Sequence, residues 1–399
     1  MFVYLDNSAT TKPHEDVIKE VRKMMEEDFG NPSSLHSMGV TAERAVKKAR
    51  KAVAGALRAS EKEIYFTCGG TEGNNAAIFG SARARRKRGK RIITSRAEHA
   101  SVLEAFRCLE GQGFVVDYLD VDEKGSVPIE NLENALRDDT ILVSLMVVNN
   151  ELGTISPIKE YASLIKSKSN GIFHCDAVQA LGKIPFEPEC TGVDLAVISG
   201  HKVHGPKGTG AIYINRSLTI PPLLYGGGQE AGFRSGTENV PGIAGFGIAV
   251  DNIVGAEEGE AGKLARLRRR LLEGLRAEVK DIIINSYEWA YGERDGIGLS
   301  SPAILNVSFL GCPGEALLHS LEQRNIYVST GAACSSRKKG SHVLASAGLS
   351  EEVVSSAIRF SFCAQNKEEE VDYVVEEIKQ AVNRIRKVTR YKGERRFGR

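Results

Sequence analysis

Between residues 64 and 214 the chain alternates short apolar segments with segments of helical periodicity, and this alternation restricts the fold more than any other feature. It predicts the α/β class, in which a mostly parallel sheet carries helices on both faces. Ligands of such sheets gather at the carboxyl ends of the strands. The expected strands are 64–67, 91–94, 114–118, 141–147, 172–175, 194–198 and 211–214, and the expected helices are 71–88, 99–111, 130–137 and 157–168.

The segments on either side of this unit follow a different pattern. Before it we expect a strand at 2–5 and helices at 14–25 and 41–57, and after it a mostly helical stretch at 242–280. The expected order then continues with strand 303–309, helix 314–323, strands 326–328 and 357–361, and helix 367–386. The sequence therefore predicts a large α/β domain followed by a smaller α+β domain.

Bulk composition excludes several classes of protein. With 399 residues, of which 42% are hydrophobic and 26% charged, the chain has the composition of a globular protein with room for two domains. No run of about 18 apolar residues occurs, so no transmembrane helix is expected. Met1 leads into Val3–Leu5 without a signal region, which favours a cytoplasmic location. A net charge of +2 gives no reason to expect direct nucleic-acid binding.

The seven cysteines are scattered, and no two have the spacing C-x-x-C. Disulfide frameworks and zinc sites are therefore not expected, and no metal site is predicted. Most of these cysteines should be small buried hydrophobes, including Cys68 and Cys175 at the ends of expected strands. Cys334 differs, because it lies in the small-residue stretch 329–336 and a basic run follows. Nearby cations lower the pKa of a thiol, and an exposed thiolate is reactive.

A glycine-rich loop with a lysine follows the expected strand 194–198. The loop runs from Ser199 to Gly210, and Lys202 lies near its start. A lysine on such a turn can form a Schiff base with a carbonyl cofactor, and Ser199 and His201 can donate hydrogen bonds to an anion. Taken alone, however, the loop favours a solvated lysine at the surface.

Two further strand ends carry residues that suit the same cofactor. Gly70 and Thr71 form a turn between strand and helix, where bare amides and the helix dipole can hold a phosphate. Asp176 and Gln179 follow strand 172–175; an aspartate suits the pyridine nitrogen of pyridoxal phosphate, and an amide suits its phenolic oxygen. The phosphate turn, the acid and the lysine on successive strand ends together predict a pyridoxal phosphate site.

The same segments resemble the class V aminotransferase-like cysteine desulfurases of the NifS and IscS type. The resemblance runs nearly end to end, through Tyr4–Thr11, Phe29–Ser34, Ala97–His99, Val148–Thr154, Ser199–Gly210, Arg234–Val240, Ser329–Ser336 and Ile358–Ser361. It implies the fold type I architecture of pyridoxal phosphate enzymes and a homodimer. It also implies a large cofactor-binding domain at 14–255, and a small domain at 1–13 and 256–399 that carries the cysteine loop.

The resemblance assigns roles to residues that their local pattern leaves open. His99 would stack on the pyridine ring and move protons, although a lone histidine there is usually a cap or a surface residue. Asn150 would contact the cofactor and the substrate carboxylate, although its surroundings are typical of a turn. Thr237 would reach the cofactor phosphate of the neighbouring subunit. Arg359 would bind the substrate carboxylate, and a structural carboxylate is its alternative partner.

For Cys334 the resemblance implies the thiol that accepts sulfur when L-cysteine is converted to L-alanine, which leaves a persulfide on the enzyme. Lys202 would hold the cofactor and remove the α-proton, Asp176 would keep the ring protonated, and His99 would be a candidate acid. A sulfur-acceptor protein would use the sulfur for iron–sulfur cluster assembly or for thiolation of tRNA or a cofactor. Two departures bear on this step: the segment after Cys334 is slightly shorter than in the commonest relatives, and Cys363 replaces the usual glycine.

Two alternatives stay open. The first is another enzyme on this scaffold, such as a selenocysteine lyase or a transaminase. A transaminase has no need of a loop cysteine, whereas a selenocysteine lyase would use the same site. The second is a sulfur-delivery scaffold that depends on a partner and has little activity alone. The presence of Lys202, Asp176 and His99 argues against an inactive protein. The basic stretch Arg83–Arg91 and the tail from Arg384 are expected to be solvated, or to dock an acidic partner.

Overall fold

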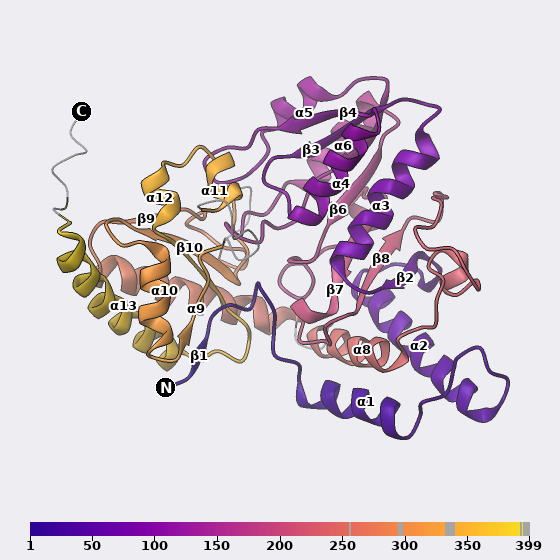
Figure 1. The fold of residues 1–399 in the computed structure, drawn as a ribbon, viewed down its shortest axis with the longest axis horizontal. Helices are drawn as coiled ribbons and strands as arrows, with labels where there is room; N and C mark the ends of the chain where they lie inside the picture. Colours follow the sequence, from indigo (N-terminus) through magenta and orange to yellow (C-terminus); the bar gives the residue numbers. More distant parts are fainter. Residues whose placement is uncertain (255–256, 294–297, 332–339, 392, 394–399) are drawn as a thin grey trace.

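The computed structural model describes residues 1–254, 257–293, 298–331, 340–391 and 393, and these form two units that lie side by side (Figure 1). The larger unit contains a seven-stranded sheet, and the smaller unit contains a three-stranded and a two-stranded sheet. The helices α8 (Val240–Val254) and α9 (Glu257–Glu278) follow one another along the chain and lead from the larger unit into the smaller one.

The seven-stranded sheet has the order β2-β8-β7-β6-β5-β3-β4 among the described residues. Neighbouring strands from β7 to β4 run parallel, whereas β8 is antiparallel to both β2 and β7. The predicted mostly parallel sheet is therefore confirmed. Its strands are β2 (Ile64–Thr67), β3 (Arg91–Ser95), β4 (Val115–Leu119), β5 (Thr140–Ser144), β6 (Ile172–Asp176), β7 (Leu195–Ser199) and β8 (Gly210–Ile214).

Helices cover both faces of this sheet because its central strands are apolar on both sides. Ile172 of β6 belongs to a core that it shares with α3 (Gly70–Arg85) and α4 (Ala100–Gly111). The next residue, Phe173, belongs to a core on the opposite face, formed with α2 (Ser37–Ala56), α6 (Ile158–Lys168) and α8. The larger unit also contains α1 (Glu15–Glu26), α5 (Ile129–Ala135), α7 (Pro188–Thr191) and the 3-10 turns η1 (Glu61–Glu63), η2 (Gly200–Lys202) and η3 (Glu230–Gly232).

The smaller unit is built on an antiparallel sheet of order β12-β10-β9. Its strands are β9 (Ile282–Ile284), β10 (Ile304–Phe309) and β12 (Ala357–Ser361), and it carries α9, α10 (Gly314–Glu322) and α13 (Glu368–Thr389). The N-terminal strand β1 (Val3–Tyr4) pairs in parallel with β11 (Ile326–Tyr327), and a bridge from Asp6 to Ser361 extends the contact. Both ends of the chain therefore meet in this unit. Within the described residues, no helix has the length and apolar character that a membrane span requires.

Some boundaries differ from the predicted ones. α2 begins at Ser37 rather than at 41, because the His36 side chain accepts a hydrogen bond from Gly39 N and caps the helix. A side chain at position 39 would prevent this start, since a Cβ there would lie 2.2 Å from the Ser34 backbone oxygen. β5 ends at Ser144, short of the predicted end at 147. The short elements β9, α11 (His342–Ser346) and α12 (Glu351–Ser355) escape prediction because they carry too little periodicity.

Candidate active site

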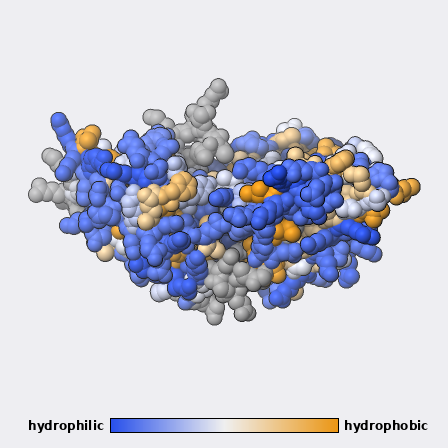
Figure 2. All heavy atoms as spheres, turned by 90° about the horizontal axis from the view of Figure 1, so that it is seen from below, coloured by the Kyte–Doolittle hydropathy of each residue, from blue (hydrophilic) through white to orange (hydrophobic). Residues whose placement is uncertain are grey.

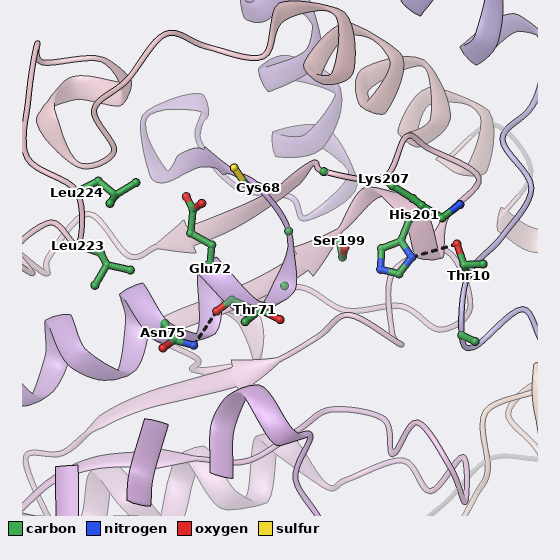
Figure 3. Close-up of a pocket in the computed structure, with 14 residues that line it drawn as sticks. Thr10, Cys68, Thr71, Glu72, Asn75, Ser199, His201, Lys207, Leu223 and Leu224 are labelled. Atoms are coloured by element: carbon green, nitrogen blue, oxygen red, sulfur yellow. Dashed lines mark hydrogen bonds between the residues drawn. The ribbon is translucent and has the colours of Figure 1, made fainter. Parts of the chain in front are cut away.

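The carboxyl ends of β6 and β7 lie side by side, because these strands pair in parallel with Asp176 opposite Val197. A pocket of about 750 Å³ opens at the same edge of the sheet. In Figure 3, Ser199, His201 and Thr10 lie on one side of the pocket, and Cys68, Glu72 and Leu224 lie on the other. The pocket brings together these predicted site residues: Gly70, Thr71, Ser199 and His201.

One wall of this pocket can hold an anion. α3 begins there at Gly70, and its N-cap residue Gly69 supplies no side-chain cap for the backbone N–H groups. Gly69 has a φ of 145°, which favours glycine. The Ser199 hydroxyl is buried and has no hydrogen-bond partner among the described residues. An orphaned hydroxyl beside an uncapped helix N-terminus fits a phosphate group.

His201 adds a neutral donor to the same wall. Its Nδ1 lies 3.2 Å from Thr10 Oγ1. Burial, together with the positive charges of Lys202 and Lys207, lowers the pKa of His201 to about 4. At neutral pH the imidazole is therefore uncharged and retains one N–H group for a hydrogen bond.

Lys202 is held by the start of the chain. It ends the turn η2 directly after β7, and its Nζ donates to the backbone oxygens of Ser8 at 2.6 Å and Ala9 at 2.7 Å. Thr11 holds the same turn from both sides, because its hydroxyl donates to His201 O and accepts from His204 N. The N-terminal segment therefore positions the amine that the sequence predicts for covalent chemistry.

Asp176 is buried at the end of β6, where two donors fix its orientation. Its Oδ2 accepts from Asn74 Nδ2 at 2.8 Å, and its Oδ1 accepts from Val178 N at 3.0 Å. Gln179 lies close by and donates from Nε2 to Ser8 O at 3.0 Å. Asn74 was not predicted from the sequence. A polar side chain on the buried side of a helix of small residues would have been its signal.

His99 is the N-cap of α4, which is one of the two ordinary roles left open for it. Its Nδ1 accepts from Ser101 N and lies 2.8 Å from Ser101 Oγ. Asn74 Nδ2 donates to Ser101 Oγ at 2.9 Å as well as to Asp176, so a chain of side chains joins His99 to the buried carboxylate. Desolvation lowers the pKa of His99, and the negative charge of Asp176 opposes this shift. Because Nδ1 is an acceptor, the neutral ring carries its proton on Nε2.

Arg359 has a structural carboxylate as its partner, which was the alternative that the sequence left open. Its Nη2 forms a 2.7 Å ion pair with Asp6 Oδ1, and its Nη1 donates to Asn150 O at 2.9 Å. Two further atoms, Arg359 Nε and Asn150 Oδ1, are buried and lack hydrogen-bond partners within the described residues. Buried polar atoms without partners are costly. A small ligand with both acceptor and donor groups, such as an amino acid, would satisfy them.

A sequence profile described as "Aminotransferase class-V" matches residues 3–374 of the chain. The chain belongs to the class-V aminotransferase family. A relative from Methanosarcina thermophila, named "Cysteine desulfurase IscS", is 45% identical in a match that covers 97% of this chain and 93% of the relative. A solved structure titled "NIFS-LIKE PROTEIN" has 40% identity and a TM-score of 0.88, with 96% of this chain and 100% of that chain covered. Another, titled "SspA in complex with cysteine", has 33% identity and a TM-score of 0.79, with 92% and 100% covered.

These relatives confirm the resemblance to the NifS- and IscS-type branch of the class-V family. Several predicted residues of this class-V chain do not line the pocket: Lys202, His99, Asn150, Asp176, Gln179, Arg359 and Thr237. Thr237 is exposed, and Cys334 lies outside the described residues. Glu151 lies close to the described residues on both sides of the segment that contains Cys334. The Ser341 hydroxyl donates to the Glu151 carboxylate, and a Cβ at Gly331 would lie 2.5 Å from Glu151 Oε2. Glu151 was not predicted from the sequence, although it directly follows Asn150.

Cys68 contradicts the prediction that it packs in the core. It is exposed and lines the pocket, because β2 ends at Thr67 and Cys68 falls on the glycine turn. Its Sγ accepts from Arg234 Nη2 at 3.0 Å, and Arg234 also pairs with Glu72. Partial burial, together with Glu72, raises the pKa of Cys68, so this cysteine is a protonated thiol at neutral pH. Cys175 is fully buried, as predicted.

Glu98, directly before His99, is a buried carboxyl behind this class-V site. Its Oε1 accepts from Ser95 Oγ at 3.0 Å and from Met146 N at 2.9 Å. Its Oε2 is buried without a partner within the described part of the chain. Burial raises the pKa of Glu98 to about 8, and the charge of Asp176 contributes to the rise. The carboxyl is therefore mostly neutral at pH 7.

The variant Glu98→Gln should remove a pH dependence of stability. A carboxyl whose pKa is higher in the folded chain stabilises the fold fully below its unfolded pKa of 4.5, and this stabilisation is lost as the pH rises toward about 8. The melting temperature of Glu98→Gln should therefore rise relative to that of the wild type between about pH 5 and about pH 8. The exposed control variant Glu110→Gln should follow the wild type. A constant difference between Glu98→Gln and the wild type would contradict the neutral carboxyl.

Proposed function

We propose that this chain is a cysteine desulfurase that uses pyridoxal phosphate to convert L-cysteine to L-alanine, with a persulfide formed on Cys334. The main support is that the ends of two adjacent strands, β6 and β7, bear the Asp176 carboxylate, the orphaned Ser199 hydroxyl and the Lys202 amine. The names of two relatives, "Cysteine desulfurase IscS" and "SspA in complex with cysteine", support the same activity.

The residues present fit pyridoxal phosphate. Donors for its phosphate come from the start of α3 and the end of β7: Gly70, Thr71, Ser199 and His201. Asp176 would hold a proton on the pyridine nitrogen, the Gln179 amide would donate to the phenolic oxygen, and Lys202 would bind the aldehyde carbon. When bound, this cofactor supplies the electron sink that makes the α-proton of cysteine acidic and its sulfur open to attack.

Four side chains would bind the amino-acid substrate or move its protons. Arg359 and Asn150 bind its α-carboxylate, and the buried Arg359 Nε–H, which lacks a partner, then donates to a carboxylate oxygen. Nζ of Lys202 takes the α-proton. His99 moves protons through Nε2, because its Nδ1 is engaged by Ser101.

Cys334 would be the nucleophile that accepts the sulfur of the substrate. Its thiolate attacks the sulfur of the substrate, the Cβ–S bond breaks, and the carbon takes up a proton, for which His99 is the candidate acid. L-Cysteine and a thiol thus become L-alanine and Cys334–S–SH without any oxidant. A sulfur-acceptor protein then takes the outer sulfur for iron–sulfur cluster assembly or for thiolation of tRNA or a cofactor. Since a reduced thiol is needed, we place this reaction in the cytosol.

A homodimer is part of the proposal. Thr237 is exposed and apart from the pocket of its own chain, which suits a residue that serves the neighbouring site. Large apolar side chains are exposed around α1 and on the loop after β8, among them Ile18, Met25, Phe29, Leu35, Leu224 and Tyr225. Figure 2 shows hydrophobic residues gathered on the half of the molecule that carries α1 and α2. A second copy of the chain would cover these side chains.

Borohydride reduction tests the proposed function. The purified protein should be yellow, and reduction should remove the absorption band and leave a pyridoxyl group on Lys202, as read by mass spectrometry of its peptides. Lys207 is the matched competitor because it also lines the pocket. Lys207→Ala should keep the label and Lys202→Ala should lose it. A label on Lys207, or no label in the wild type, would overturn the assignment.

A further inference from the structure

Lys183 is a second buried lysine, behind the proposed cofactor site. It is 9% exposed and follows Gln179 in the turn after β6. Its Nζ lies 3.3 Å from Gln179 Oε1 and 3.5 Å from the backbone oxygen of Lys202. A cavity of about 30 Å³ lies beside it and is lined in part by Lys202 and Cys363. Burying a lysine amine carries a cost in free energy, and both acceptors of this amine belong to residues of the proposed site.

The two contacts of the Gln179 amide determine its orientation. Oε1 accepts from Lys183 Nζ, and Nε2 donates to Ser8 O at 3.0 Å. A flipped amide would place Oε1 against the Ser8 carbonyl oxygen and the Nε2 hydrogens against the lysine amine. Both contacts would be repulsive when the amine is charged. Ser8 O also accepts from Lys202 Nζ at 2.6 Å, so the three side chains share one small network.

We propose that Lys183 is a positioning residue that fixes the Gln179 amide with its donor end toward the cofactor ring and supports the backbone of Lys202 from behind. The inference rests on the proposed function, because Gln179 is expected to donate to the phenolic oxygen of pyridoxal phosphate. Lys183 itself touches neither the substrate nor the cofactor in this arrangement. It acts through the amide, whose second Nε2 hydrogen remains available when the first is donated to Ser8.

Lys183 can donate a hydrogen bond to Gln179 Oε1 in either of its charge states. Burial, together with the charge of Lys202, lowers the pKa of Lys183 to about 7, while Cys363 opposes the shift. An amine and an ammonium group both donate an N–H to Gln179 Oε1. The charge, however, acts on Lys202 directly as well as through the amide. A test must therefore separate the effect on Gln179 from the electrostatic effect on Lys202.

The test compares Lys183→Met in two backgrounds, the wild type and Gln179→Ala. The first readout is visible circular dichroism of the lysine-bound cofactor without cysteine, which reports the orientation of the ring. In the wild-type background, Lys183→Met should lose at least about half of this signal and lower kcat by roughly tenfold, with the KM for cysteine little changed. In the Gln179→Ala background, Lys183→Met should cause a much smaller change in both quantities, because only its direct effects on Lys202 remain. Lys183→Arg, which keeps a donor, should retain most of the wild-type signal.

The outcomes separate three cases. An equal effect of Lys183→Met in both backgrounds overturns the proposal, because charge or packing then acts independently of Gln179. An unchanged dichroism signal in Lys183→Met overturns it as well. If the wild type binds no pyridoxal phosphate at all, the proposed function fails together with this inference, whereas a normal wild type with an unaffected variant contradicts the inference alone. If Lys183→Met does not fold, the same comparison can be made with Lys183→Leu. The shorter leucine side chain leaves more space in the small cavity.

Discussion

Replacing Cys334 by alanine should lower the release of alanine from cysteine by roughly a thousandfold or more, while cofactor binding and the spectral response to cysteine persist. The proposed cofactor and substrate residues, Lys202 and Arg359 among them, lie on other segments and are untouched by the change. The sulfur step, in contrast, needs a thiolate that takes the sulfur as the Cβ–S bond breaks. The measurement is alanine formed with a reductant present, alongside the absorption spectrum.

Cys68→Ala is the matched control, because Cys68 is the exposed cysteine that lines the described pocket. Partial burial and Glu72 raise the pKa of Cys68, so little thiolate forms at neutral pH, and Arg234 already engages its sulfur. This variant should keep most of its alanine output. If Cys334→Ala keeps its output and Cys68→Ala loses it, the proposed sulfur step is wrong. Selenocysteine turnover that survives in Cys334→Ala would reopen the question of the substrate, because selenium can leave without a thiol.

The strand ends that carry the candidate site could be predicted because their sequence signal is local. Asp176 and Ser199 each follow a mostly apolar segment, and glycines mark the turns that begin at Gly69 and Gly200. Parallel pairing of β6 and β7 places Asp176 and Ser199 at one edge of the sheet. Two antiparallel pairings through β8 bring the turn after β2 to the same edge. The same reasoning led to Lys202 and Gln179, which follow those strands directly.

The partners of these residues could not be predicted, because they come from remote segments. Arg359 meets Asp6 across 353 positions of the chain, and Lys202 meets Ser8 across 194. No periodicity links such pairs, and the choice of partner depends on how distant segments pack in the folded chain. The prediction that Cys68 is buried was wrong for a local reason. A shift of one residue at the end of β2 decides whether a side chain points into the core or lies on the turn.

Arg359→Lys should raise the KM for cysteine by roughly 10- to 100-fold and leave the affinity for pyridoxal phosphate close to that of the wild type. Lysine keeps the charge but loses the planar fork, so one charged hydrogen bond to the substrate carboxylate is lost, which is worth about 1.5–3 kcal/mol. The KM comes from the rate of alanine formation, and cofactor affinity comes from titration of the apoenzyme.

The ion pair with Asp6 makes a purely structural role the competing explanation for Arg359, and Asp6→Asn separates the two. In the present contacts, Nη2 donates to Asp6 and Nη1 to Asn150 O, while Nε–H and one hydrogen on each Nη remain for a ligand. If these donors bind the substrate, Asp6→Asn lowers the melting temperature but changes the KM by less than about threefold, because the guanidinium stays near its place. If Arg359→Lys and Asp6→Asn lower the melting temperature alike and neither changes the KM, Arg359 serves the fold and the substrate carboxylate binds elsewhere.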